Sequence, residues 1–175
     1  MSNNSNFMDL MSTRHSTRAF KNTPIPEDKI NTVMDWATRG PSAGNLQSYQ
    51  IFLVFKDSEK EKLVESAHGQ NYVSEAPLAM IFCSDPKRCS SEYGSRGETL
   101  FSIQDATISC VYAQIAAHSL GLSSVWIGSF DEEKVSDILG LSNDLRPIAI
   151  LPIGFPDEEP EITNRRPLSE IFQRV

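Results

Sequence analysis

The chain has 175 residues, of which 39% are hydrophobic and 22% charged, and its formal net charge is -7. These values predict one globular domain, residues 1–175, and the negative charge argues against nucleic acid as a partner. Apolar runs such as 50–55 are far shorter than the roughly 20 residues of a membrane-spanning helix, so no membrane segment is expected.

The first feature along the chain is a basic cluster formed by Arg14, Ser16 and Arg18. Guanidinium groups match phosphate oxygens two at a time, and a serine hydroxyl adds one short hydrogen bond, so this spacing suits a single bound phosphate. The plainer alternative is a solvated arginine patch whose surface ion pairs contribute little stability. A second basic pair, Arg165 and Arg166, lies near the other end of the chain.

Hydrophobic periodicity and capping residues predict helices and strands in alternation. The expected helices are Glu27–Arg39, 58–67 with Ser58 and Glu61 as a capping box, Ile103–Leu120, and 132–139 capped by Asp131. The expected strands are Gln50–Phe55, Leu78–Cys83, Ser124–Ile127 and Ile148–Ile153. Alternation of this kind favours a sheet with helices on both faces.

The two ends of the chain, Met1–Phe20 and Asp157–Val175, have weak periodicity of their own. Such segments need another surface to fold on, and an obligate dimer that exchanges its arms would supply one. The proline-rich stretch Asp157–Pro167 is expected to be extended and superficial.

The three cysteines, Cys83, Cys89 and Cys110, are an odd number without metal-ligand spacing. Together with a polar N-terminal stretch that lacks an apolar targeting core, they favour a cytoplasmic location. Cys83 and Cys110 lie in apolar runs and are expected in the core. Cys89 follows two basic residues, which could lower its pKa and raise its reactivity, but a cysteine outside any motif is usually a packing residue.

Two further segments have compositions that suit a ligand. Residues 40–47 combine small residues, which let backbone approach a flat molecule, with the polar side chains of Ser42, Asn45 and Gln47. Residues 125–129 follow a strand, where open α/β sheets commonly bind ligands. The alternatives are an ordinary loop and a plain strand exit with Gly128 as the turn.

Several common sites are absent from the sequence. It contains no GxGxxG or GxxxxGK[ST] loop. The histidines, His15, His68 and His118, are scattered without metal-ligand spacing, so no metal site is expected.

Taken together, these segments resemble the flavin-dependent nitroreductase family. The resemblance extends from 14–20 through 41–47 to 117–122, 126–128 and 165–168. It implies an α+β fold of three α-β-α layers with a central, mainly antiparallel sheet, and an arm-exchanged homodimer with two FMN sites at the subunit interface. This sheet differs from the parallel one that alternation alone suggests, and it is the one expected here.

The resemblance also implies which residues bind FMN. They are Arg14, His15, Ser16 and Arg18; Pro41, Ser42, Ala43 and Asn45; Ile127 and Gly128; and Arg165 and Arg166. The first group would hold the phosphate and ribityl chain, with one of the two C-terminal arginines. The second group would come from the partner subunit and line the isoalloxazine, and the third would offer backbone N–H groups near flavin N5. Gln70 and Asn71 would approach the pyrimidine edge of the flavin.

Two places depart from the family pattern. Gln47-Ser48-Tyr49 stands where the family often has Gln-Pro-Trp, which should alter the pocket edge. Only residues 87–101 could replace the helical insertion that covers the flavin in longer members. Their Tyr93, Arg96 and Phe101 are therefore candidate substrate-pocket residues.

The implied function is hydride transfer from NADH or NADPH through flavin N5 to nitroaromatic, quinone or similar flat acceptors, by a ping-pong mechanism. The cofactor would carry this chemistry, so no catalytic side chain is expected. The alternatives are a flavin-binding protein without efficient turnover, such as a redox sensor or flavin store, a reductive dehalogenase-like member or flavin-consuming oxidase of the same fold, and an arginine-mediated interaction domain without cofactor.

Overall fold

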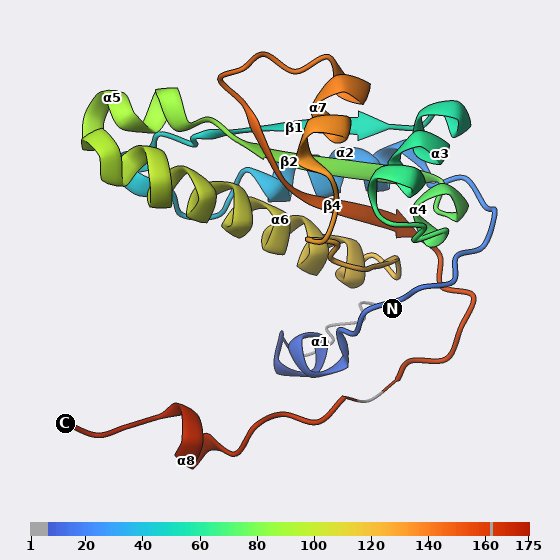
Figure 1. Ribbon diagram of the computed structural model, residues 1–175. Coiled ribbons are helices and arrows are strands. Elements are labelled where there is room, and N and C mark those ends of the chain that lie inside the picture. Colours follow the sequence, from blue (N-terminus) through green and yellow to red (C-terminus); the bar gives the residue numbers. More distant parts are fainter. Residues whose placement is uncertain (1–6, 162) are drawn as a thin grey trace.

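A computed structural model describes residues 7–161 and 163–175, and its centre is a four-stranded sheet (Figure 1). The strands are β1 (Tyr49–Val54), β2 (Leu78–Ser84), β3 (Ser123–Ser124) and β4 (Arg146–Gly154), in the order β1-β2-β4-β3. All three strand pairings are antiparallel, which confirms the sheet implied by the family resemblance.

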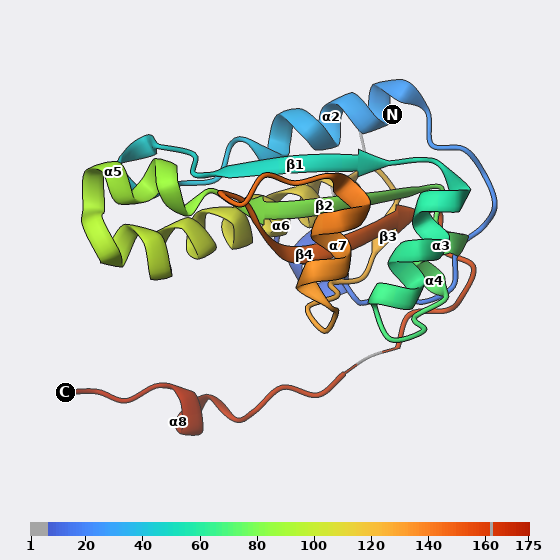
Figure 2. The ribbon, with the colours of Figure 1, turned by 45° about the horizontal axis from the view of Figure 1, so that its top comes forward.

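Helices cover both faces of this sheet. On one face lie α2 (Glu27–Ala37) and α6 (Ser102–Ser119), and on the other lie α3 (Asp57–Ser66) and α7 (Glu132–Leu139). Side chains alternate along a strand, so the even-numbered residues of β2 join the α2/α6 core and its odd-numbered residues join the α3/α7 core. The expected three-layer α-β-α architecture is therefore confirmed, and Figure 2 shows it from a second direction.

The helix ends agree with the sequence at α7 and differ at α3. The Asp131 side chain accepts a hydrogen bond from the Lys134 N–H at 3.2 Å, and Gly140 ends α7 in the left-handed region at φ 60°. The capping box expected at Ser58 is wrong. Helix α3 begins at Asp57, because the Lys56 carbonyl already accepts the first helical N–H groups, and no side chain caps it.

The third expected strand, 124–127, is interrupted. An isolated bridge between Ile127 and β4 follows β3 in the same register. That register places Val125 opposite Pro152, which has no N–H to donate to the ladder. A proline in the neighbouring strand therefore limits β3 to two residues.

The remaining helices were not among those expected; all but α5 are short, and α5 begins with the cap Asp85 followed by Pro86. They are α1 (Phe7–Thr13), the 3₁₀ turn η1 (Ala43–Asn45), α4 (Tyr72–Glu75), α5 (Pro86–Arg96), the π-helical turn η2 (Gly97–Phe101) and α8 (Leu168–Ile171). Within the described residues, no helix is both long and apolar enough to cross a membrane.

The two arms are joined to each other where they leave the sheet. The Lys21 N–H donates to the Phe155 carbonyl at 2.9 Å, and the Asp157 N–H donates to the Ala19 carbonyl at 2.9 Å. Beyond this point the C-terminal tail is exposed and extended, as expected, and it runs away from the body with α8 standing apart (Figures 1 and 2). Residues 1–6 of the N-terminal arm lie outside the described part of the chain.

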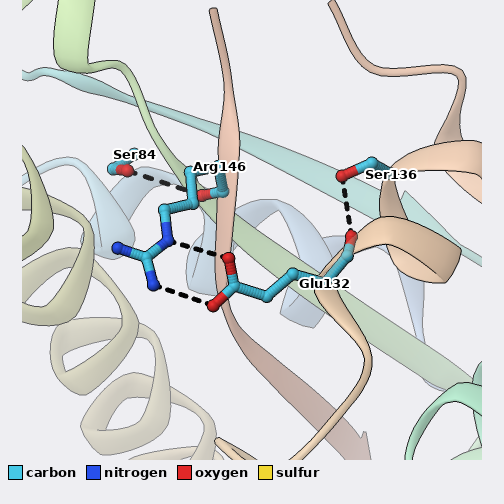
Figure 3. Close-up of polar contacts among 4 residues, drawn as sticks. All are labelled: Ser84, Glu132, Ser136 and Arg146. Carbon is cyan, nitrogen blue, oxygen red and sulfur yellow. Dashed lines mark hydrogen bonds and ion pairs between the residues drawn. The ribbon is translucent and has the colours of Figure 1, made fainter. Parts of the chain in front are cut away.

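A surface ion pair ties α7 to β4 (Figure 3). Arg146 donates two hydrogen bonds to the Glu132 carboxylate, each at 2.8 Å. The Ser136 hydroxyl donates to the Glu132 backbone carbonyl, and the Ser84 hydroxyl reaches the Arg146 carbonyl. The Arg146 hydrogen bond holds the pKa of Glu132 below its ordinary value.

All three cysteines are unpaired and buried. Cys83 and Cys110 lie in the core as expected, and burial raises the pKa of the Cys83 thiol to about 12. Cys89 is equally buried within α5 and behaves as a packing residue, so it does not present the exposed thiol that its basic neighbours suggested.

Candidate cofactor site

Both arms contribute to one pocket of about 260 Å³, here called the arm pocket. It is lined by Ser12, Thr13, Arg14 and His15 of the N-terminal arm and by Pro160, Glu161, Thr163 and Arg165 of the tail. Two guanidinium groups far apart in sequence thus face the same hollow. Such an arrangement can bind an anionic group, although Glu161 also lines the wall.

The two neighbouring C-terminal arginines have different surroundings. Arg165 lines the arm pocket, where its Nη1 donates to the Thr163 hydroxyl at 2.8 Å. Arg166 forms an ion pair with Glu170 at 3.3 Å instead. Arg14 forms no ion pair with any described residue, which leaves its charge available to a ligand.

His15 presents an unsatisfied polar atom beside these guanidinium groups. Its Nδ1 lies 3.0 Å from the Thr13 carbonyl, whereas its Nε2 is buried and has no hydrogen-bond partner among the described residues. The His118 ring lies edge-on to it, with ring centroids 6.4 Å apart. Burial, with the nearby charges of His15 and Arg14, lowers the pKa of His118. A buried polar atom of this kind fits a site that takes a polar group.

The other two residues of the basic cluster do not line the arm pocket. Ser16 forms a parallel bridge with Ser124 of β3. The Arg18 backbone N–H donates to the Glu158 carboxylate at 2.6 Å, and the Arg18 residue is exposed. Their predicted contact with a phosphate therefore stays a prediction.

Residues of the second predicted segment line another pocket, of about 470 Å³, here called the loop pocket. Its walls are Pro41, Ser42 and Ala43 together with Phe101, Gln104, Asp105, Thr107 and Ile108 of η2 and α6. Asn45 is exposed and lies outside this lining. The pocket is a mainly apolar hollow with a few polar groups, the kind of surface that accepts a flat organic molecule.

Asp105 holds the loop at both ends and was not singled out from the sequence. The residue is 2% exposed, and its carboxylate accepts the Ala43 N–H at 2.9 Å and the Ser48 N–H at 3.2 Å. Burial raises the pKa of Tyr49, and the Asp105 charge adds to that rise. Asp105 is the one acidic residue within the apolar stretch 102–119, and that signal could have identified it.

The loop backbone lies in an uncommon conformation. Gly44, Asn45 and Gln47 have φ of 54°, 56° and 50°. A Cβ on Gly44 would also lie 2.5 Å from the Tyr93 hydroxyl, so this glycine permits both the backbone angle and the close approach of Tyr93.

The three candidate substrate-pocket residues lie together next to the loop pocket. The rings of Tyr93 and Phe101 meet edge to face with centroids 5.3 Å apart, and the Arg96 guanidinium lies 5.4 Å from the Phe101 centroid. Their contact with a substrate stays a prediction.

Only one of the two backbone donors predicted near flavin N5 is free. The Ile127 N–H donates to the Ile150 carbonyl at 3.0 Å, so it is already used by the sheet. Gly128 is exposed, and no described residue accepts its N–H. Gln70 lies beside this turn, since its side-chain amide reaches the Ser129 carbonyl at 3.3 Å, whereas Asn71 is exposed.

The arm pocket and the loop pocket lie at opposite ends of α6. Asp105 marks one end, and His118, which contacts His15, marks the other. At 1.5 Å per residue, the two positions are about 20 Å apart along the helix. Within one chain, the residues predicted to bind the phosphate therefore lie far from those predicted to line the isoalloxazine.

Comparisons with known proteins agree with this architecture. A model described as the nitroreductase family matches residues 11–88 and 73–155. A Methanothermobacter thermautotrophicus protein, whose name includes NADH dehydrogenase/NAD(P)H nitroreductase, is 32% identical over 157 residues, covering 87% of this chain and 78% of that protein. The NADH dehydrogenase of Thermus thermophilus is 28% identical over 185 residues and covers 90% of each.

Among solved structures, the NADPH:FMN oxidoreductase of Vibrio harveyi complexed with NAD+ is similar with a TM-score of 0.89 and 25% identity. The match covers 97% of this chain and 77% of that one. Because the family model spans most of the sequence and the fold agrees throughout, this chain belongs to the nitroreductase family.

Proposed function

We propose that the chain is an FMN-dependent oxidoreductase that uses NADH or NADPH as electron donor. Family membership and the names of its relatives support this proposal. The observation that carries it is the arm pocket, where Arg14, His15 and Arg165 converge from the two ends of the chain. A bound anion would pair with the two guanidinium groups and could also accept a hydrogen bond from the unsatisfied imidazole nitrogen.

The arm pocket would hold the FMN phosphate. Arg14 and Arg165 would donate charge-assisted hydrogen bonds to it, and the unpartnered His15 Nε2 would donate another if that nitrogen carries the proton. The free N–H of Gly128 would donate to the flavin ring. When bound, FMN supplies the redox chemistry, accepting a hydride at N5 from the nicotinamide and passing its electrons to the acceptor.

The functional unit would be a homodimer in which each site takes one pocket from each subunit. The separation of the two pockets along α6 supports this arrangement. Large apolar side chains are exposed at Val111 on α6 and at Leu168, Ile171 and Phe172 of the tail. Burial of such surface against a second copy would contribute the hydrophobic free energy that a single chain leaves unused.

In the loop pocket, the flavin ring would lie against Pro41, Ser42 and Ala43, and the nicotinamide and the acceptor would stack on that ring in turn, which is a ping-pong scheme. The walls of this pocket, formed by small residues and Phe101, suit flat molecules such as a flavin, nitroaromatics and quinones. The three unpaired cysteines support a cytoplasmic location for this activity.

The visible absorption spectrum of the purified protein tests the proposal, followed by anaerobic addition of NADH or NADPH. We expect flavin absorption that bleaches with at least one of the two donors and returns when a quinone or nitroaromatic is added. Flavin that never bleaches would point to a storage or sensing role. Absence of flavin absorption, even after FMN is supplied, would overturn the proposal.

A further inference from the structure

The loop between α2 and β1 is attached to α6 by a single buried carboxylate. Asp105 accepts the Ala43 N–H with one oxygen and the Ser48 N–H with the other. No described lysine, arginine or histidine pairs with this carboxylate, so backbone donors alone satisfy it. A buried charge persists only where such hydrogen bonds compensate for its lost hydration.

The Ala43 and Ser48 N–H groups lie on either side of the part of the backbone that has positive φ angles. Between them lie Asn45 and Gln47, two residues with positive φ that are not glycine. The left-handed region costs free energy for such residues and is populated where the surroundings hold the backbone there. Within the loop, the Gln47 N–H donates to the Ser42 hydroxyl at 3.1 Å, which tightens the same turn.

We propose that Asp105 is a positioning residue for flavin binding: it holds the loop 41–48 in its strained conformation, so that Pro41, Ser42 and Ala43 form a ready-made wall. This inference rests on the proposed function, because it takes that wall to face the flavin. Asp105 acts through the backbone of the loop and is not itself a catalytic residue. Pre-organisation of this kind improves affinity by removing the cost of ordering the loop when the ligand binds.

A matched control lies one helical turn further along α6. Ser109 is also buried, and its hydroxyl donates to the Ala37 carbonyl at 2.8 Å. Asp105→Asn and Ser109→Ala each weaken buried hydrogen bonding made by α6, the first to the loop 41–48 and the second to Ala37 at the end of α2. Only the first acts on the loop that forms the wall. Asparagine has one acceptor oxygen, so one of the two N–H groups would meet an amide NH₂ instead.

The experiment combines amide hydrogen exchange of the FMN-free protein with fluorescence titration by FMN. In the wild type, we expect the Ala43 and Ser48 amides to exchange at least about tenfold more slowly than the Gly44 amide, which has no acceptor among the described residues. In Asp105→Asn, we expect this protection to fall and the Kd for FMN to rise about tenfold, the scale of one hydrogen bond to a charged group. Ser109→Ala should change neither the amide protection nor the Kd for FMN by more than about twofold. This should hold even if its melting temperature falls as far as that of Asp105→Asn.

Different outcomes separate the two proposals. If Ala43 and Ser48 exchange as fast as Gly44 in the wild type, Asp105 does not hold the loop, and this result needs no folded variant. If Asp105→Asn loses protection but binds FMN normally, its role in flavin binding is wrong. If the loop loses protection in Asp105→Asn while the wild type binds no FMN, the oxidoreductase proposal fails, and with it the flavin role, although Asp105 still orders the loop.

Discussion

At the scale of single residues, the clearest distinction is between Arg165 and Arg166. They are identical side chains at adjacent positions, yet the first lines the arm pocket and the second pairs with Glu170. The sequence leaves them equivalent, because adjacent residues in an extended tail point in different directions that only their surroundings determine. Replacing either arginine by alanine therefore changes the net charge by the same amount, but only the change at Arg165 alters the arm pocket.

We expect Arg165→Ala to raise the Kd for FMN about ten- to a hundredfold, because a charge-assisted hydrogen bond to the phosphate is lost. Arg166→Ala should raise it by less than about threefold. Fluorescence titration of FMN-free protein measures both. Equal weakening by the two variants would mean that the general positive potential of the tail, and not a contact from Arg165, attracts the phosphate.

The sequence suggests which residues form the candidate site, but it does not show which of their hydrogen-bonding groups are free. Ile127 and Gly128 were equal candidates to donate a backbone N–H, but the bridge to Ile150 occupies the first. Asp105 was overlooked because its partners are backbone N–H groups, and these leave no mark in a motif. Which hydrogen-bonding groups remain free depends on partners that are distant in sequence.

At the scale of elements, long periodic segments were predicted well and short ones were not. The bounds of α2, α6 and α7 agree with the pattern of apolar residues within about two positions. Helices α1, α4 and α8 have too few turns for a pattern to emerge. The early end of β3 depends on Pro152 in the neighbouring strand, so no window of sequence around β3 could reveal it.

The ion pair between α7 and β4 should make the stability of the fold depend on pH. The pKa of Glu132 lies below its ordinary 4.5 because Arg146 hydrogen-bonds the carboxylate, so the pair stabilises the fold at neutral pH and ceases to do so as pH falls through the lowered pKa. We expect Glu132→Gln to reduce the free energy of unfolding at pH 7 by at most about 1 kcal/mol, since the pair is half exposed. The difference should shrink as the pH falls below 4.5, so it should be smaller at pH 3 than at pH 7.

Urea unfolding at the two pH values measures this effect. Glu133→Gln is the control, because it removes the same charge one residue away, where no ion pair is formed with any described residue. A loss of stability that is the same at both pH values, or that Glu133→Gln reproduces, would exclude the ion pair as its source.

At the scale of the whole molecule, the single chain leaves large apolar side chains exposed at Val111 on α6 and at Leu168, Ile171 and Phe172 in the tail. The resemblance implied a homodimer, and the exposure of these side chains supports it. The arms were expected to need another surface, and the tail indeed runs away from the body (Figure 1). The sequence alone could not show which face of α6 would contact a second copy, because apolar residues are spread almost all round this helix.

A charge on the exposed side of α6 should prevent assembly. We expect Val111→Asp to convert the dimer to monomer and to abolish flavin binding, because a carboxylate buried in the interface without a partner carries a desolvation cost. Ser58→Asp adds the same charge to exposed α3 on the opposite layer and should leave both properties unchanged. Sedimentation velocity and the flavin absorbance of the purified variants measure the two. A dimeric Val111→Asp that retains flavin would contradict the proposed interface.

The hydrogen bonds that join the arms at Lys21–Phe155 and Ala19–Asp157 also bear on how the protein is made. Synthesis proceeds from the N-terminus, so Arg14 and His15 leave the ribosome long before their neighbours in the arm pocket exist. The wall that contains Arg165 becomes available only after residues 160–165 have been made. In the proposed function, capture of FMN through this pocket would therefore follow the synthesis of both arms, and a variant that stops before Pro160 would fold its sheet yet be unable to retain the flavin.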